Sequence, residues 1–206
     1  QGVSSAASDV YKRQEKKSPI MGVWERLTVD EAFERYAGFS LLQNFDREKL
    51  AAQAEKLGIA CQTTDTFDDI FFRIFGLHIE RKLGRQHPVI LTDYPASQAS
   101  LARLKADDPR VAERFEVYID GVEIANAFGE LTDAKEQKRR FQHEAEERRA
   151  AGKTVFPIDE DLLSALQHVH SAAGIALGVD RLAMILLGAK SIDEVLAFSA
   201  NELFKK

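Results

Sequence analysis

Apolar residues in the first third of the chain recur at helical spacing between polar capping residues and glycines. Thr28 and Glu31 form a capping-box pattern, which predicts a helix that begins there and ends at Gly38. A second helix is expected over residues 46–57 and a third over 66–84, where the apolar residues follow a period of three to four. The apolar positions of the third helix are Ile70, Phe71, Ile74, Phe75 and Leu77.

Alternation of apolar and polar residues over 114–127 predicts a β-hairpin. Its centre is Asp120-Gly121, a pair typical of the two-residue type I′ turn. The alternation indicates that one face of this hairpin packs on the core. The residues of that face are Phe115, Val117, Val122 and Ile124.

The other segments alternate between helix and strand without a regular βαβ order. Short strands are expected at Val89–Leu91 and Gly174–Gly178. Helices are expected over about 133–151, after Pro157, from an Asp180 cap to Gly188, and after a capping box of Ser191 and Glu194. This order favours an α+β fold in which helices flank an antiparallel sheet.

Two carboxylates are expected on one face of the hairpin. A two-residue turn pairs Tyr118 with Glu123, which makes Glu116 and Glu123 diagonal neighbours with backbones roughly 7–8 Å apart. Carboxylates at that separation can share one Mg²⁺ whose coordination is completed by phosphate and water. Taken alone, the hairpin favours the alternative that this face is solvated and that the glutamates bind no metal ion.

The segment Gly174–Leu182 places glycines before an arginine. Gly174 and Gly178 face the same side of the predicted strand with Ala176 between them, which leaves a surface poor in side chains. Arg181 lies in the first turn of the next helix, where a cation opposes the helix dipole. It would be favourable there if it reached a polyphosphate, and the alternative is a pair with Asp180 or another surface acid.

Composition limits the class of protein. The chain has 206 residues, a formal net charge of -5 and one cysteine. The negative charge argues against nucleic-acid binding by bulk electrostatics, and a single cysteine is typical of a reducing cytoplasm, where we expect the protein to act. Residues 1–21 lack a periodic apolar face and are interpreted as a disordered tail or a non-native scar, and residues 22–206 as one domain.

Two strings resemble the class II aminoacyl-tRNA synthetases of the lysyl branch. RFEVYIDGVEIANAFGELTD (114–133) is similar to that family's hairpin and substrate strand, and GIALGVDRL (174–182) to its motif 3. YPASQASLARL (94–104), together with Ala176, resembles the elongation factor P β-lysine ligases within this branch. The chain does not show motif 1 or the arginine of motif 2. Residues 22–206 are therefore interpreted as the C-terminal part of a class II synthetase-like catalytic domain that belongs to a longer enzyme. We expect that this part does not form adenylate at a normal rate by itself.

The resemblance implies an ATP-dependent ligase that forms an adenylate of (R)-β-lysine or lysine and transfers it to a lysine of elongation factor P. A homodimer is expected of the full-length enzyme, whereas tRNA and membranes are not expected as partners. The alternatives are a lysyl-tRNA synthetase fragment and a non-catalytic class-II-like regulator that binds an amino acid.

The resemblance also implies roles for particular residues. Arg181 and Glu123 would be catalytic, and Glu116 and Glu123 would hold Mg²⁺. The residues implied to bind ATP are Glu116, Val117, Glu123, Gly178 and Arg181. The residues implied to bind the amino acid are Ser97, Gln98, Glu123, Asn126, Phe128, Glu130 and Ala176. Because strict alternation places Asn126 and Phe128 opposite Glu123, these roles require a bend or bulge near residues 127–129.

Overall fold

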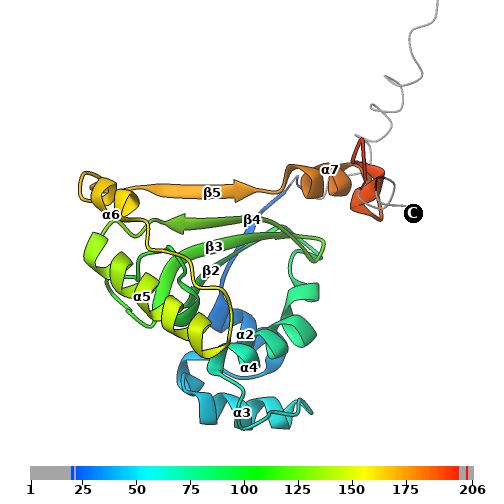
Figure 1. The fold of residues 1–206 in the computed structure, drawn as a ribbon. Helices are drawn as coiled ribbons and strands as arrows, with labels where there is room; N and C mark the ends of the chain where they lie inside the picture. The colour runs from blue at the N-terminus through cyan, green and yellow to red at the C-terminus, as the bar shows by residue number, and fades with distance from the viewer. Residues whose placement is uncertain (1–19, 21, 200–202, 204–206) are drawn as a thin grey trace, which may run out of the picture. The chain divides into compact units, whose positions relative to one another are not determined.

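A computed structural model describes residue 20, residues 22–199 and residue 203. The tail expected over residues 1–21 therefore lies almost wholly outside the described residues. Within them, the chain forms six α-helices and five strands, which confirms the α+β class (Figure 1). The chain divides into two compact units. Unit 1 comprises the residues up to 92, 116–126 and 177 onward, and unit 2 comprises 93–115 and 127–176.

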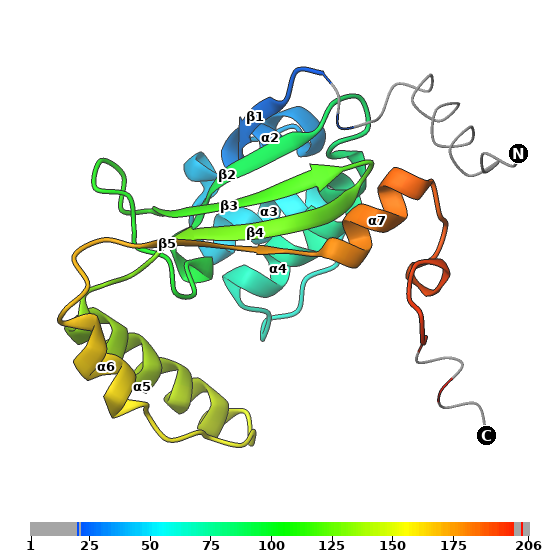
Figure 2. The ribbon, with the colours of Figure 1, turned by 90° about the horizontal axis from the view of Figure 1, so that it is seen from above.

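The strands follow the order β1-β2-β3-β4-β5 in a five-stranded sheet (Figure 2). Their bounds are β1 Glu25–Thr28, β2 Val89–Pro95, β3 Val111–Ile119, β4 Val122–Gly129 and β5 Ala173–Leu177. The α-helices are α2 Val29–Ala37, α3 Arg47–Lys56, α4 Phe67–Ile74, α5 Ala134–Ala150, α6 Glu160–Leu166 and α7 Val179–Leu187. Shorter helical turns are η1 Leu42–Asn44, η2 Phe75–Ile79, η3 Glu80–Lys82, η4 Ala96–Gln98 and η5 Ile192–Glu194.

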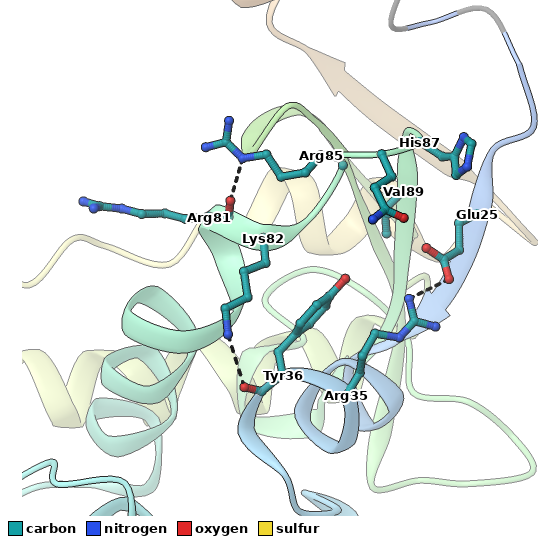
Figure 3. A pocket seen from close by; sticks show the side chains of 10 residues that line it. Glu25, Arg35, Tyr36, Arg81, Lys82, Arg85, His87 and Val89 are labelled. Carbon is teal, nitrogen blue, oxygen red and sulfur yellow. Dashed lines mark hydrogen bonds and ion pairs between the residues drawn. The ribbon is translucent and has the colours of Figure 1, made fainter.

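Helix α2 begins and ends at the predicted residues. The Thr28 hydroxyl accepts from the Glu31 backbone N–H at 3.1 Å, and the Glu31 carboxylate accepts from the Thr28 N–H at 2.8 Å. Gly38 adopts φ +84°, the left-handed conformation that ends a helix at low steric cost. The helix is joined to β1 by an ion pair of 2.7 Å between Arg35 and Glu25 (Figure 3).

Strand β1 was not predicted from the sequence, and the direction in which it pairs with β2 also differs from the prediction. It runs parallel to β2, with Leu27 opposite Leu91, whereas an antiparallel sheet was expected. Leu27 and Leu91 are both buried, so the pair contributes apolar side chains to the core of unit 1. Four residues in a strand are too few to show a periodicity in the sequence.

The prediction of one continuous helix over residues 66–84 is wrong beyond Ile74. Helix α4 ends there, and the chain continues through the π-helical turn η2 and the 3₁₀ turn η3. The wider π turn changes which side chains face inward, so that Phe75 and Ile79 are buried while Leu77 is 66% exposed. The Phe71 and Phe75 rings stack at 5.6 Å between centroids, which extends the aromatic core of unit 1.

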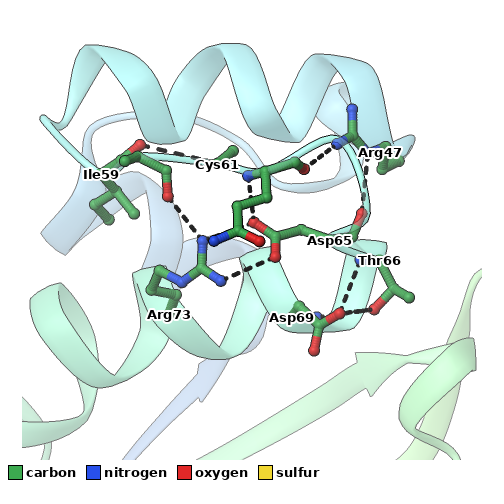
Figure 4. Close-up of polar contacts among 9 residues, drawn as sticks. Arg47, Ile59, Cys61, Asp65, Thr66, Asp69 and Arg73 are labelled. Carbon is green, nitrogen blue, oxygen red and sulfur yellow. Dashed lines mark hydrogen bonds and ion pairs between the residues drawn. The ribbon is translucent and has the colours of Figure 1, made fainter. Parts of the chain in front are cut away.

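The loop between α3 and α4 is held by two arginines (Figure 4). Arg73 forms a two-point contact with Asp65, at 2.9 and 3.2 Å, and donates to the carbonyl of Ala60. Arg47 donates to the carbonyls of Gln62 and Asp65 at 2.6 and 3.0 Å. Hydrogen bonding to Arg73 lowers the pKa of Asp65 below its ordinary value. The loop is thereby fixed by charge and backbone bonding.

Unit 2 contains a small core formed by alanines, and it also contains the helices α5 and α6. Ala99, Ala102 and Ala112 are buried, with Leu104 and Phe128 packed against them. Helix α6 begins at Glu160 with Asp159 as its cap, three residues after the predicted start at Pro157. Lys138 of α5 and Glu160 of α6 form an ion pair of 2.9 Å. Arg140 of α5 donates to the carbonyls of Ser100 and Ala102, which attaches α5 to the loop that carries the alanine core.

Candidate functional site

The predicted hairpin turn is confirmed. Asp120 and Gly121 have φ values of +52° and +74°, and a type I′ turn requires positive values at both positions. The turn joins β3 to β4 through these two residues alone, which is the geometry from which Glu116 and Glu123 were assigned to one face. The hairpin tip, with both glutamates, belongs to unit 1.

Glu116 is buried, with 7% of the residue exposed, so the interpretation of a solvated strand face is wrong for this residue. Its carboxylate accepts a hydrogen bond from the Tyr118 hydroxyl at 2.5 Å. Tyr118 is itself buried and contacts the Phe75 ring of η2. The expectation of a single core face is therefore incomplete, because the face that carries Glu116 is also covered.

Arg181 contacts Glu123, which matches the alternative of a pair with another surface acid. Its guanidinium donates to the Glu123 carbonyl at 2.9 Å and lies 3.4 Å from the Glu123 carboxylate. Both side chains are accessible, at 49% and 34% exposure, so the pair can exchange partners with a ligand. The structure thus brings together the two residues that were expected to be catalytic.

Gly178 connects β5 to α7 next to this pair. Its N–H donates to the Ile124 carbonyl at 2.8 Å, and a Cβ added at this position would lie 3.4 Å from the Arg181 side chain. Gly178 occupies the cap position of α7 without a side-chain hydrogen bond, so the prediction that Asp180 caps this helix is wrong. Val117, which was also expected to bind ATP, has a buried side chain and could reach a ligand only through its backbone.

Two residues of unit 2 that were expected to bind the amino acid, Gln98 and Phe128, contact Arg114, which the sequence analysis did not select. Its guanidinium lies 4.5 Å from the Tyr94 ring centroid and 5.6 Å from that of Phe128. It also donates to the Gln98 carbonyl at 2.8 Å, in the turn η4 that contains Ser97. A planar cation between two rings fixes the positions of both.

Glu130 lies directly against Gly174. A Cβ added at Gly174 would be 2.5 Å from a Glu130 carboxylate oxygen, closer than real Cβ contacts allow. The Glu130 N–H donates to the Ala172 carbonyl at 3.0 Å, which holds this segment beside the start of β5. The predicted surface poor in side chains is therefore covered at Gly174 by a carboxylate, while Ala176 on the same strand is exposed.

The structure shows no interruption where a bend was expected. Strand β4 runs without a break from Val122 to Gly129. Asn126 lies in its unit 1 segment, and Phe128 in its unit 2 segment. The roles of Asn126 and Phe128 in binding an amino acid stay predictions.

No group of three or more His, Cys, Asp and Glu side chains in the described part of the chain is arranged to hold a metal ion. The donors at the hairpin are two carboxylates, a set that fits Mg²⁺ when phosphate oxygens complete its coordination. A metal at Glu116 and Glu123 would therefore depend on a bound nucleotide. None of the helices in the described ranges is long and apolar enough to cross a membrane.

The hairpin of β3 and β4 precedes β5 and α7, which is the order of the two segments that resemble class II synthetases. Residues 2–202 match the family of class II tRNA synthetases (D, K and N), and the chain belongs to this family. It is 45% identical over 181 residues to the elongation factor P--(R)-β-lysine ligase of Pectobacterium carotovorum subsp. carotovorum (strain PC1). That alignment covers 86% of this chain and 55% of the relative.

Ligases of the same description from two other organisms give similar values. The one from Pectobacterium atrosepticum is 45% identical over 181 residues, and the one from Edwardsiella ictaluri is 44% identical over 180. Each alignment covers 86% of this chain and 55% of the relative. The chain thus spans about half the length of the curated relatives it matches.

Proposed function

We propose that this chain is the catalytic portion of an ATP-dependent ligase that activates (R)-β-lysine and transfers it to a lysine of elongation factor P. The contact of Arg181 with Glu123 carries this proposal. It places a guanidinium group that can bind a polyphosphate beside a carboxylate that can bind the accompanying metal ion. The name shared by the relatives supports the choice of substrate and acceptor.

The reaction proceeds in two steps. A carboxylate oxygen of the amino acid attacks the α-phosphorus of ATP, the bond to the β-phosphate oxygen breaks, and pyrophosphate leaves. The lysine amine of the acceptor then attacks the carbonyl carbon of the adenylate, AMP leaves, and an amide bond remains. Neither step needs a nucleophile from the protein, so catalysis depends on positioning and charge stabilisation.

On the nucleotide side, Arg181 releases Glu123 and donates to the terminal phosphate of ATP. Glu116 and Glu123 would hold Mg²⁺, which supplies neutralisation of phosphate charge when bound. The hydroxyl of Tyr118 orients the Glu116 carboxylate through their hydrogen bond. Val117 and Gly178 contribute backbone surface to the same nucleotide.

On the amino-acid side, Glu130 accepts the substrate ammonium above Gly174. Phe128 and the turn with Ser97 and Gln98 line the pocket, and Arg114 positions them. The methyl of Ala176 selects where the amino group lies.

The test is a chimeric ligase in which the aligned 181 residues of this chain replace the matching segment of the Pectobacterium carotovorum relative. The chimera is given ATP and labelled lysine, either α-lysine or (R)-β-lysine, together with elongation factor P or total tRNA. We expect label on elongation factor P with (R)-β-lysine and none on tRNA. Label on tRNA with α-lysine would indicate a lysyl-tRNA synthetase, and no activation of either amino acid would indicate a non-catalytic binding protein.

A further inference from the structure

The side chain of Arg140 attaches helix α5 to the turn that follows η4. One nitrogen of its guanidinium group, Nη1, donates to the carbonyls of Ser100 and Ala102 at 3.0 and 2.8 Å. Another nitrogen, Nε, donates to the carboxylate of Glu136, one turn earlier in α5, at 2.9 Å. The Arg140 side chain is only 18% exposed. One planar group therefore joins acceptors of the helix and of the turn, which a single ammonium group is less suited to do.

The turn that Arg140 binds contains a strained residue. Ser100 adopts φ +52°, a left-handed conformation that is costly for a residue with a Cβ. Such a conformation persists only where the surrounding contacts fix it. Because the carbonyl of Ser100 itself accepts from Arg140, this arginine is one of the contacts that fix the turn. If the contact is lost, we expect the turn to relax and the residues next to it to move.

The same turn connects two parts of the proposed amino-acid pocket, all of which lie in unit 2. It follows η4, which contains Ser97 and Gln98. It then leads to Ala102, which forms an antiparallel bridge with Glu130. A change in the turn would therefore alter the position of η4 relative to the carboxylate that was assigned to the substrate ammonium.

We propose that Arg140 is a positioning residue for the amino-acid side of the ligase, because it clamps the turn that connects η4 with Glu130. This inference rests on the proposed function and adds a role for α5 to it. Arg140 acts through the backbone of the turn and not by contact with the substrate. Its loss should change the affinity for the amino acid and leave that for ATP nearly unchanged, because the residues proposed to bind the nucleotide belong to unit 1.

The test compares the chimeric ligase with its Arg140→Gln and Arg139→Gln variants in ATP–pyrophosphate exchange. The concentrations of ATP and of the amino acid that the parent chimera activates are varied separately. Arg139 is the matched control. It also lies in α5 and pairs with Glu136, but it is 67% exposed and makes no other polar contact among the described residues.

We expect Arg140→Gln to raise KM for the amino acid by ~10-fold, since a small shift of the pocket residues weakens several contacts at once. Its KM for ATP should stay within about twofold of the parent value. Arg139→Gln should leave both constants at the parent values. An equal rise of both constants in Arg140→Gln would indicate a general defect and overturn the inference, as would an amino-acid KM equal to that of Arg139→Gln.

Amide hydrogen exchange of the same three proteins tests the clamp without the reaction. The N–H groups of Ala102 and Arg103 donate to the carbonyls of Ala99 and Gly129 at 2.7 and 2.8 Å. Peptides that span residues 99–103 should therefore exchange ~10-fold faster in Arg140→Gln than in Arg139→Gln, and equal rates would overturn the inference. A parent chimera that activates no amino acid would instead refute the proposed function, and the exchange rates would still decide whether Arg140 fixes the turn.

Discussion

Replacing Gly174 with alanine is expected to displace the carboxylate of Glu130 and weaken amino-acid binding. The added Cβ would lie 2.5 Å from the carboxylate oxygen, whereas ordinary contact begins at 3.4 Å, so the oxygen must move by about 0.9 Å. The obstacle is the end of a flexible side chain, so the fold should survive. A displacement of this size in a positioning group costs on the order of 100-fold in rate.

The assay is ATP–pyrophosphate exchange by the chimeric ligase as the amino-acid concentration is varied. We expect kcat/KM for (R)-β-lysine to fall by roughly 100-fold in Gly174→Ala, with most of the change in KM if Glu130 binds the ammonium in the ground state. Gly76→Ala is the matched control, because a Cβ at Gly76 has no neighbour closer than 4.0 Å. It should retain the activity of the parent.

A double-mutant cycle with Glu130→Asp separates this mechanism from a general defect. The shorter side chain removes the close contact, so Gly174→Ala should cost much less in the Glu130→Asp background than in the parent. Parental KM in Gly174→Ala alone, or strictly additive effects in the double variant, would refute the assignment of Glu130 as the partner of the ammonium.

Two further substitutions test the fold, each by urea unfolding followed by circular dichroism. Gly84→Ala should destabilise unit 1 by roughly 3 kcal/mol, because φ is +72° and the new Cβ would meet the Tyr118 backbone carbonyl at 2.5 Å; a loss below ~0.5 kcal/mol would contradict that close packing. Glu136→Gln should cost about 1 kcal/mol at pH 7, since the carboxylate pairs with both Arg139 and Arg140 at partly exposed positions. These arginines lower the pKa of Glu136 from 4.5 to about 2, so its contribution is complete above about pH 4.5 and is lost as the pH falls toward 2. The difference between parent and variant should therefore shrink over that range, and a difference that is constant with pH would refute the ion-pair explanation.

Features set by neighbouring residues could be predicted from the sequence. The capping box of Thr28 and Glu31 and the Asp120-Gly121 turn each depend on a few consecutive side chains, and both are confirmed. The hairpin strands follow from the same local alternation. The family resemblance was readable because its strings are contiguous.

Features that depend on distant residues could not be predicted. The parallel pairing of β1 with β2 joins segments about sixty residues apart, and four residues carry no periodic signal. The π turn η2 begins at Phe75, whose ring stacks on that of Phe71. The spacing of apolar residues in this segment is that of an ordinary α-helix and does not indicate a π turn. Arg114 is the first residue of the hairpin string, but its role was overlooked. The two rings that it contacts, those of Tyr94 and Phe128, belong to separate strands.

The candidate site could be predicted only in part, because some of its features depend on local sequence and others on distant packing. The pairing of Arg181 with Glu123 was inferred as convergence on one ligand, and the structure shows direct contact. The burial of Glu116 was missed, because an alternating strand pattern does not reveal that both faces are covered. A carboxylate buried beside a tyrosine hydroxyl has a fixed orientation, which suits a metal ligand better than the flexible surface residue that alternation suggested.

The account depends most directly on whether Arg181 and the hairpin carboxylates hold the triphosphate of ATP. The measurement that tests it is ATP–pyrophosphate exchange at varied ATP concentration by the chimeric ligase and its Arg181→Ala variant. The account predicts that kcat/KM for ATP falls by on the order of 100-fold or more, with the affinity for the amino acid nearly unchanged. A value within about threefold of the parent would contradict it.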